Sequence, residues 1–385
     1  MTKNYDVIII GAGAAGLCAA RAALRLGRKV LILDMGAVAA RKVAVSGGGR
    51  CNFTNLAAID SLRYFGENTD FAKSILARVK PQDILDWAAS HGIVAEEKSP
   101  GQFFSADGAG AIVDALMKDA KGADFIFNVK VKNVDKESGK WSVQSGNNEY
   151  SSQSLIIATG GVSYPTLGVS DFGMKIAKKF GHKIVPPRPG LCVLKTDAFP
   201  PELAGISLPV VINGIADSLL FTHSGIGGPA AYRASLGDIS NIVIDFIPGA
   251  SAAELLRKTK KENGRCAPAA VFALPQKFAK WVVMGADKNL ADYKDSELTE
   301  LGDKINNFRI ESAERVGFAN AEVMAGGVST DQISSKTLES KLCPGLYFAG
   351  EVLDITGDLG GFNLHFAFAS GLIAGDGIIT INWNE

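Results

Sequence analysis

The chain has 385 residues, enough for two or three domains, and its apolar (47%) and charged (21%) fractions are ordinary for a soluble protein. Forty basic residues balance forty acidic ones, which argues against broad binding to nucleic acid or anionic membranes and leaves room only for local patches. The five cysteines are far apart and form no CxxC pair, so we expect a reducing, cytoplasmic setting, no metal site and no redox dithiol. The apolar run from Val7 to Leu24 is broken by glycines and by Arg21, so we expect neither a secretory leader nor a membrane span.

The first motif is YDVIIIGAGAAG, residues 5–16, in which an apolar run leads into a glycine loop and then into a helix-forming stretch. This order predicts a buried parallel strand, a tight turn and a helix whose N-terminus binds the pyrophosphate of a dinucleotide. The next predicted strand, 29–33, ends in an aspartate that can accept both hydroxyls of an adenosine ribose. The residues assigned to this part of the site are Gly11 for the turn, Gly13 for close approach of the pyrophosphate, Ala15 within the loop, Gly16 for helix packing and Asp34 for the ribose.

A second glycine-rich segment, SGGGRCNFTN, covers residues 46–55. Three consecutive glycines are unfavourable inside a helix or a strand, so we predict a loop. It is either an exposed flexible loop or a second wall of the dinucleotide site, with Lys42 or Arg50 near phosphates, Gly47 to Gly49 under a flat ring and Asn52 as a neutral hydrogen-bonding group. Cys51 fits a packed position better than a reactive thiol.

Strands are predicted at 125–134, 141–144 and 149–158. The first should return a parallel strand to the sheet near residues 129–131, where the backbone amide of Val131 can meet an adenine edge. The last runs into Thr159, Gly160 and Gly161, and this junction belongs on the same side of the sheet as the first glycine loop because ligands gather at the carboxyl ends of parallel strands.

The proline-rich segment 186–190 is the clearest linker signal. Strands are predicted beyond it at 191–195, 208–213, 218–222 and 241–246, and helices in 251–307. The predicted domains are 1–190 and 333–385 for cofactor binding, 191–250 and 313–332 for an inserted β domain, and 251–312 for an inserted helical domain.

A last strand, 345–350, stops at Gly350 and Glu351. Glu351, with Asp354 as second choice, is placed to bind ribityl hydroxyls. The helix that begins near residue 363 should direct the backbone amides of Gly361, Phe362 and Asn363 at the pyrimidine ring of a flavin, where negative charge collects on reduction. A nicotinamide cofactor would need mainly the first glycine loop and Asp34. The later segments suit the ribityl chain and ring system that FAD adds, so the predicted cofactor is FAD.

The segments SGGGRCNFTN (46–55), ATGG (158–161), FTHSGIGGPA (221–230), AGGV (325–328) and GLYFAGEVLDITGDLGGFN (345–363) resemble the BaiN/RdsA family of FAD-dependent oxidoreductases. The resemblance implies an α/β fold with a discontinuous Rossmann-like FAD-binding domain, an inserted β-barrel-like domain and a small helical domain. It carries FAD roles onto Gly11, Gly13, Gly16, Asp34, Lys42, Gly49, Thr159, Gly160, Glu351, Gly361, Phe362 and Asn363. One departure is Gln102 and Ser105, where many members have Arg and Pro, so the substrate is not carried over.

Two histidines are candidate catalytic residues, although hydride transfer at flavin N5 does not require one. His223 precedes a glycine loop that opens a helix at Pro229, and the alternative is a purely structural turn. His365 lies just inside the last helix, and the alternative is a packed side chain among aromatic residues.

The predicted function is an FAD-dependent oxidoreductase that transfers a hydride between flavin N5 and a small organic substrate in a cleft beside the insertion. A second GxGxxG motif is missing, so NAD(P)H either visits transiently as donor or is not used. The rival hypothesis is a flavin-binding protein for RNA modification or for binding alone, against which the zero net charge counts. We therefore expect no nucleic-acid or membrane partner, and leave the oligomeric state open.

Overall fold

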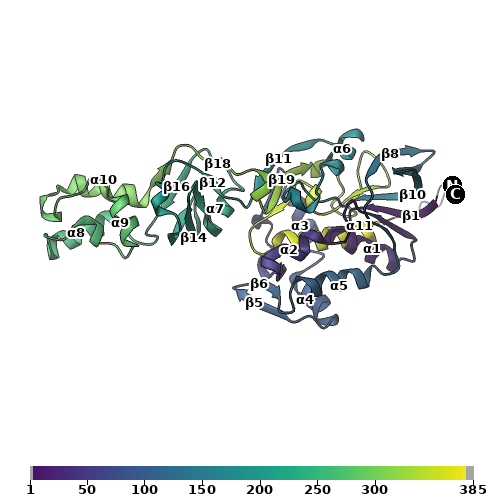
Figure 1. Cartoon of the computed structure of the whole chain (residues 1–385), viewed down its shortest axis with the longest axis horizontal. Helices are drawn as coiled ribbons and strands as arrows, with labels where there is room; N and C mark the ends of the chain where they lie inside the picture. The colour runs from purple at the N-terminus through teal and green to yellow at the C-terminus, as the bar shows by residue number, and fades with distance from the viewer. Residues whose placement is uncertain (1–2, 379–385) are drawn as a thin grey trace. The chain divides into compact units, whose positions relative to one another are not determined.

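The structure is a computed structural model that describes residues 3–378. Its contacts divide the chain into a discontinuous unit, 1–188 with 323–385, and an inserted unit, 189–322, and each unit is described by itself (Figure 1). By these contacts the chain returns to the discontinuous unit ten residues before the predicted return at 333.

The discontinuous unit is built on a seven-stranded sheet in the order β7-β2-β1-β10-β9-β8, with β20 also paired to β10. Strands β7, β2, β1, β10 and β20 run parallel, whereas β9 and β8 are antiparallel additions. The strands are β1 (Lys3–Ile10), β2 (Val30–Leu33), β7 (Asp124–Ile126), β8 (Val131–Glu137), β9 (Lys140–Ser145), β10 (Asn148–Ile157) and β20 (Leu346–Phe348). An α/β fold with a Rossmann-type sheet is therefore confirmed.

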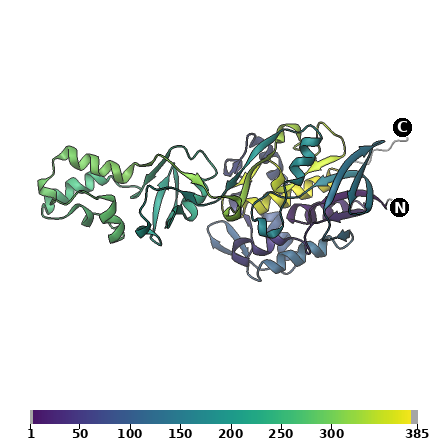
Figure 2. The ribbon, with the colours of Figure 1, turned by 45° about the horizontal axis from the view of Figure 1, so that its top comes forward.

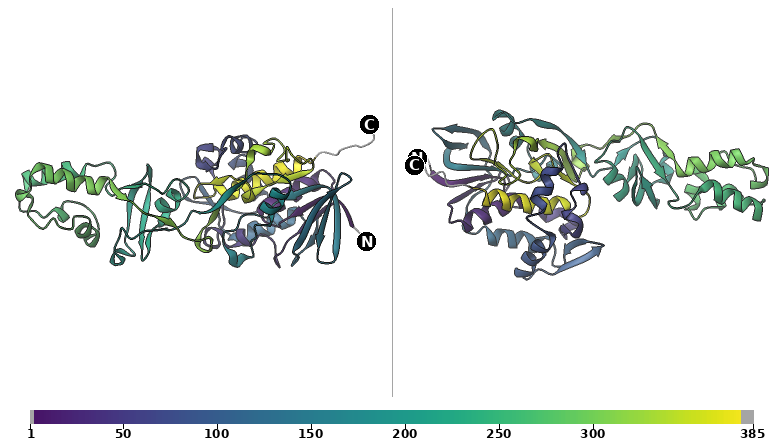
Figure 3. Two further views of the ribbon diagram at one scale, coloured as in Figure 1. Left: turned by 90° about the horizontal axis from the view of Figure 1, so that it is seen from above. Right: turned by 180° about the vertical axis from the view of Figure 1, so that it is seen from behind.

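Both faces of this sheet are covered, which explains why its central strands are apolar without alternation. Val7, Ile8 and Ile9 are completely buried. The helices of this unit are α1 (Ala14–Arg25), α2 (Arg41–Gly49), α3 (Asp70–Leu76), α4 (Pro81–Ser90), α5 (Ala109–Asp119), α6 (Phe172–Lys179) and α11 (Phe362–Asp376). Figure 3 shows α11, the last helix, lying beside α1.

Two glycines allow α11 to approach α1 closely. A Cβ atom on Gly371 would lie 2.2 Å from the carbonyl oxygen of Ala15, and one on Gly375 would lie 2.3 Å from that of Ala19. The two ends of the chain are therefore joined through direct contact of helix backbones, and the glycine loop after β1 lies at the start of this packed pair.

The predicted parallel strand at 129–131 is wrong in position. The strand that pairs with β2 is β7, Asp124–Ile126, and Val131 instead begins β8, which pairs with β9. The chain turns at Asn128, whose φ of 56° is left-handed, and the amides of Asn128 and Val129 donate to the carbonyls of Gly36 and Asp34. The turn thus keeps this segment beside the end of β2.

Smaller sheets complete the discontinuous unit. A three-stranded sheet joins β3 (Asn52–Asn55), β6 (Gln102–Ser105) and β5 (Ala95–Ser99), and two pairs join β4 (Tyr64–Phe65) to β21 (Thr356–Gly357) and β11 (Ile184–Gly190) to β19 (Val323–Val328). The segment predicted as a linker, 186–190, is therefore a strand at the boundary between the units.

The inserted unit has a seven-stranded sheet in the order β17-β16-β13-β14-β15-β12-β18. Its elements are β12 (Leu194–Lys195), β13 (Ser207–Ile212), β14 (Ile215–Thr222), β15 (Gly225–Gly227), α7 (Gly228–Ala234), β16 (Ile242–Asp245), α8 (Ala252–Glu262), α9 (Gln276–Val282), α10 (Asp295–Asn306), β17 (Phe308–Ile310) and β18 (Glu314–Arg315). Within residues 189–322, β17 and β18 are the two ends of the strand order and are not paired, so the barrel-like shape stays a prediction.

Helices α8, α9 and α10 gather on one side of the strands of this unit (Figure 2). An aromatic cluster of Phe199, Phe221, Phe246, Phe278 and Phe308 connects them to the sheet, with neighbouring rings 4.7–6.5 Å apart. The predicted β part and helical part of the insertion therefore share one core.

Among residues 3–378, no helix is both long and apolar enough to cross a membrane.

Candidate functional site

Three strand ends of the main sheet run into glycine at the same edge. The parallel register of β1, β10 and β20 places the junctions at Gly11, Gly160 and Gly350 next to one another. The strand-end arrangement predicted from the sequence is confirmed.

The glycines of the first loop divide into two that are required by packing and one that faces open space. A Cβ on Gly11 would lie 2.2 Å from the carbonyl oxygen of Ala158, and one on Gly16 would lie 1.9 Å from that of Gly11. A Cβ on Gly13 would meet no heavy atom of the described residues within 4 Å, and Gly13 is the N-cap of α1 without a side-chain cap. The backbone at Gly13 is therefore open where the sequence predicts a pyrophosphate.

Asp34, at the end of β2, fixes the loop around it. Its Oδ2 accepts from the amide of Ala12 at 2.7 Å, and its Oδ1 accepts from the amide of Gly36 at 2.6 Å. Arg41 pairs with Oδ1 at 3.1 Å and also donates to the carbonyl of Leu167. Each carboxylate oxygen thus already holds part of the loop, and a ribose hydroxyl would have to share these acceptors.

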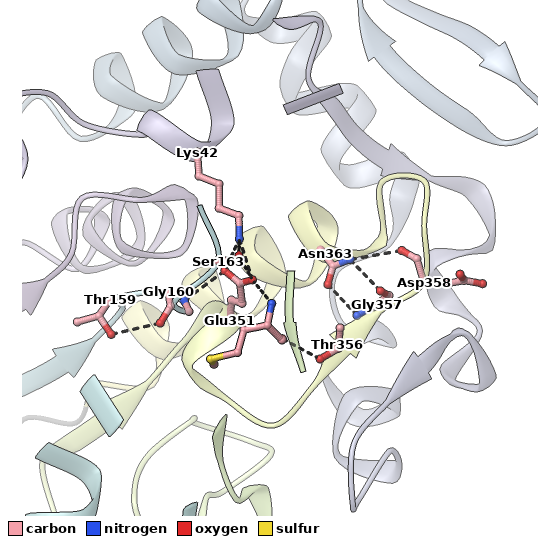
Figure 4. A network of polar contacts seen from close by, with 11 residues as sticks. Lys42, Thr159, Gly160, Ser163, Glu351, Thr356, Gly357, Asp358 and Asn363 are labelled. Carbon is pink, nitrogen blue, oxygen red and sulfur yellow. Dashed lines mark hydrogen bonds and ion pairs between the residues drawn. The ribbon is translucent and has the colours of Figure 1, made fainter. Parts of the chain in front are cut away.

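Glu351, just after β20, is the centre of a polar network (Figure 4). Both of its carboxylate oxygens lie 2.8 Å from Nζ of Lys42, which also donates to Ser163 at 2.6 Å. The amides of Gly161 and Met324 donate to the same carboxylate at 3.2 and 2.9 Å. One side chain therefore ties together α2, the glycine junction after β10 and strand β19.

The SGGG segment leaves helical geometry as predicted. The backbone of α2 departs from helical φ and ψ values at Ser46, and Gly47 and Gly48 adopt left-handed conformations with φ of 56° and 65°. No heavy atom of the described chain lies within 4 Å of a Cβ built on Gly48 or Gly49.

The residues after these glycines differ in exposure. Arg50 is exposed, and Cys51 is completely buried. Burial raises the pKa of the Cys51 thiol to about 12, so it stays protonated at neutral pH and is unsuited to nucleophilic chemistry.

The N-terminus of α11 is held in place by neutral side chains. Asn363 accepts from the amide of Gly357 and donates to the carbonyl of the same residue, both at 2.8 Å. Gly361, the N-cap at φ 94°, has no room for a side chain because its Cβ would lie 2.6 Å from the carbonyl of Thr54, and no side chain caps the helix. The first amides of a fifteen-residue helix are therefore free of a side-chain acceptor.

Asn52 and Gln102 form an amide pair beside this helix start. Nδ2 of Asn52 donates to Oε1 of Gln102 at 3.0 Å, whereas Oδ1 of Asn52 is buried without a partner among the described residues. A Cβ on Gly360 would meet the Gln102 side chain at 2.7 Å. The residue that departs from the family pattern thus packs on the loop that opens α11.

Three further predicted ligands, Asp354, Thr159 and Phe362, contact neighbouring elements of the fold. Asp354 is buried and accepts from the amide of Glu67 at 2.9 Å, and burial raises its pKa above the usual range. The hydroxyl of Thr159 faces Gly173 of α6. Phe362 is fully buried against Tyr64, with ring centroids 5.8 Å apart.

The two candidate histidines differ in their surroundings. His365 is completely buried, its ring nitrogens lie 2.8 Å from Oγ1 of Thr54 and 3.0 Å from the carbonyl of Val79, and burial lowers its pKa to about 4. His223 is exposed in the turn between β14 and β15 of the inserted unit. Of the two interpretations of His365, the structure supports the packed side chain.

Sequence reasoning missed Arg41, Ser163 and Gln102 as parts of the site. Arg41 and Lys42 are neighbours on α2, yet they hold different carboxylates, Asp34 and Glu351. The sequence shows only that two basic residues stand side by side before the glycines. It does not reveal that Arg41 pairs with Asp34, 7 residues away, and Lys42 with Glu351, 309 residues away.

The parallel sheet, the open glycine loop, the carboxylate after β2 and two further glycine junctions together define a Rossmann-type flavoprotein oxidoreductase. The chain belongs to the HI0933-like family, since the family model described as the HI0933-like protein Rossmann domain matches residues 5–377. The family predicted from the sequence is thereby confirmed.

Known relatives extend over almost the entire chain. A Haemophilus influenzae protein named ribosomal RNA dihydrouridine synthase is 38% identical over 391 residues, covering 96% of this chain and 97% of that protein. A Clostridium scindens protein named 3-dehydro-bile acid delta(4,6)-reductase is 26% identical and covers 95% and 97%. The solved structure of a 3-ketosteroid-delta4-(5alpha)-dehydrogenase from Rhodococcus jostii RHA1 aligns with a TM-score of 0.52 at 15% identity over 98% and 97% of the two chains, which supports the fold.

Proposed function

We propose that this protein is an FAD-dependent reductase of a carbon–carbon double bond conjugated with a carbonyl group, and that its substrate is a uridine of ribosomal RNA. One observation supports FAD as the cofactor. The backbone is open at Gly13, Gly48 and Gly49, and the carboxylates of Asp34 and Glu351 follow two strand ends of the same sheet. The 38% identity to a ribosomal RNA dihydrouridine synthase over 96% of the chain supports the substrate.

In this proposal the chain's residues bind the two ends of FAD separately. The open backbone at Gly13 and the α1 N-terminus hold the pyrophosphate, and Asp34 holds the adenosine ribose. Lys42, Glu351 and the junction at Thr159 to Gly161 lie at the ribityl chain, and the first amides of α11 face the flavin pyrimidine ring. Gly49, Arg50 and Asn52 form the wall across from them, and Val131 lies near the adenine.

FAD, when bound, supplies a hydride donor, and a hydride and a proton together convert the C5–C6 double bond of uridine into a single bond. The donor amides of α11 stabilise negative charge at the pyrimidine ring by roughly 0.3 to 2 kcal/mol. In this scheme NAD(P)H is the electron donor and visits the flavin only transiently, since the chain has no second GxGxxG motif to hold it.

A small organic enone is the second candidate substrate, favoured by the Clostridium scindens relative named as a bile-acid reductase. Both candidate reactions reduce a carbon–carbon double bond conjugated with a carbonyl group. The experiment below distinguishes the uridine substrate from the small enone. The expectation of no nucleic-acid partner is replaced by the first candidate, since zero net charge describes the chain as a whole and not its local surfaces.

The test compares nucleoside digests of ribosomal RNA from cells with and without the gene by mass spectrometry. Loss of one dihydrouridine, restored by the wild-type gene, is the expected result. Unchanged dihydrouridine, together with rapid oxidation of the reduced purified protein by a steroid enone, would assign the second candidate. A purified protein that neither contains nor takes up FAD would contradict both.

A further inference from the structure

The inserted unit carries a strongly basic segment within an electrically neutral chain. Residues 257–288 contain eight basic and two acidic side chains, whereas the whole chain has forty of each. The segment comprises the second half of α8, the following loop and α9, and of the sixteen acidic residues in 189–322 six precede it and eight follow it, four of these on α10. Eight of the fourteen basic residues in 189–322 therefore lie in this one segment, and only two of the sixteen acidic residues do.

The local structure directs the basic side chains to solvent. On α8, Leu256 is buried, and Lys258 and Lys261 are exposed one turn apart. On α9, Phe278 is buried, and Lys277 and Lys280 are likewise exposed three residues apart. Arg265, in the loop between these helices, is also exposed.

The acidic helix α10 does not neutralise these lysines. Two other basic residues of α8, Lys260 and Arg257, contact this part of the chain: Lys260 donates to the carbonyl of Tyr293 at 2.6 Å and lies 3.4 Å from Asp295. Arg257 donates to the Thr299 hydroxyl at 2.5 Å. Within residues 3–378 the ammonium groups of the four exposed lysines, 258, 261, 277 and 280, have no ion-pair or hydrogen-bond partner.

We propose that the basic segment 257–288 is a surface that binds the phosphate backbone of the substrate RNA. This inference rests on the proposed function, and it names the part of the chain that holds the RNA. Exposed ammonium groups on flexible stems suit phosphate contacts that do not depend on base sequence. The neighbouring aromatic residue Trp281 is packed in the core cluster, with its ring centroid 5.3 Å from that of Phe199, so it does not form a base-stacking platform.

The surface therefore supplies affinity and leaves the choice of nucleotide to other parts of the protein. A run of lysines on a helix is most often only a solvated face. What distinguishes this segment is the excess of six positive charges over 32 residues in a neutral chain, combined with four ammonium groups that form no ion pair within residues 3–378.

The test compares two quadruple variants of the full-length, FAD-loaded protein. One is K258Q/K261Q/K277Q/K280Q, and the matched control K73Q/K121Q/K140Q/K336Q removes four exposed lysines of the discontinuous unit. Glutamine keeps the helix propensity of lysine, so both variants should retain their unfolding midpoint and FAD content. Fluorescence anisotropy with a labelled 30-nucleotide RNA hairpin at several salt concentrations measures the affinity.

We expect the first variant to bind at least tenfold more weakly at 100 mM salt, and its plot of log affinity against log salt to be shallower by about 3. The control should match the wild type. Equal binding by wild type and first variant, an equal loss in the control, or tighter binding of the wild type to phosphatidylserine vesicles than to RNA would each overturn the assignment.

Dihydrouridine analysis separates this result from the proposed function. Cells that carry only the first variant should show reduced modification, and control cells should not. Wild-type cells without the modification would contradict the proposed function alone, because RNA binding in vitro does not depend on it.

Discussion

Replacing Gly13 with valine should remove FAD from the protein and leave the FAD-free fold intact. A Cβ at this position meets no heavy atom within 4 Å among the described residues, and the backbone angles, φ −80° and ψ −174°, are accessible to valine. The side chain would instead occupy the space assigned to the pyrophosphate. Binding should weaken at least a hundredfold, which corresponds to about 2.8 kcal/mol.

In contrast to FAD binding, the folding stability of the FAD-free protein should hardly change on Gly13→Val. Replacing a glycine at a compatible site restricts the unfolded chain and stabilises by about 0.4 to 1 kcal/mol. Gly16→Ala is the matched control, because its Cβ would lie 1.9 Å from the carbonyl oxygen of Gly11 and must displace backbone. That variant should lose about 1 to 3 kcal/mol of folding stability even without FAD.

The assay measures the 450 nm absorbance ratio of the purified proteins, the FAD dissociation constant by titration, and the unfolding midpoint of the FAD-free forms. A Gly13→Val protein with wild-type flavin content would refute the placement of the pyrophosphate. A Gly13→Val protein that unfolds like Gly16→Ala would show instead that the loop is packed and not open.

Four further changes test other parts of the site. Lys42→Met should lower the stability of the FAD-free protein by about 1 to 2 kcal/mol, because it leaves the half-buried Glu351 carboxylate without its cation, and adding Glu351→Gln should recover part of the loss in chemical unfolding. His365→Asn should flatten the acid side of the stability profile: the folded-state pKa of about 4 lies below the unfolded value of 6.5, so stability is present above pH 6.5 and about 3 kcal/mol is lost as the pH falls to 4. Asp354→Asn should raise the unfolding midpoint at pH 8 more than at pH 4, because burial raises the folded-state pKa of Asp354, so the wild type loses stability as the pH rises from the unfolded pKa to the folded pKa and bears the full cost above it. Gln102→Arg should raise the flavin midpoint potential by roughly 20 mV, about 1 kcal/mol for two electrons, by placing a cation at the α11 N-terminus, and an unchanged potential would contradict that placement.

Local sequence patterns were sufficient to predict where strands end in glycine. They were not sufficient to predict the turns and the long-range contacts that connect these strand ends. The run Val7 to Ile10 with the glycines after it specifies strand, turn and helix, because each step depends on neighbouring residues. The position of the parallel strand was missed because it depends on a left-handed Asn128 and on amides that bond to residues near Asp34. Such a turn has no hydrophobic pattern of its own.

The same limit applies to the polar network and to the insertion. Glu351 was placed at a strand end by its sequence, yet its partner Lys42 lies 309 residues away. The strand order of the inserted unit likewise depends on pairings between distant segments, such as β12 with β18, and short strands of two residues carry too little periodicity to predict them.

Helix α2 explains how one short segment can organise both ends of the cofactor site. Arg41 pairs with Asp34 after β2, the residue proposed to bind the adenosine ribose, and Lys42 pairs with Glu351 after β20, the residue proposed to bind the ribityl chain. The two residues also hold the same loop, through the carbonyl of Leu167 and the hydroxyl of Ser163. Because side chains at adjacent helix positions diverge by about 100°, one rigid turn can set the separation of the two carboxylates. The glycines that follow on α2 then leave the backbone open beside them, so anchoring and access come from the same nine residues.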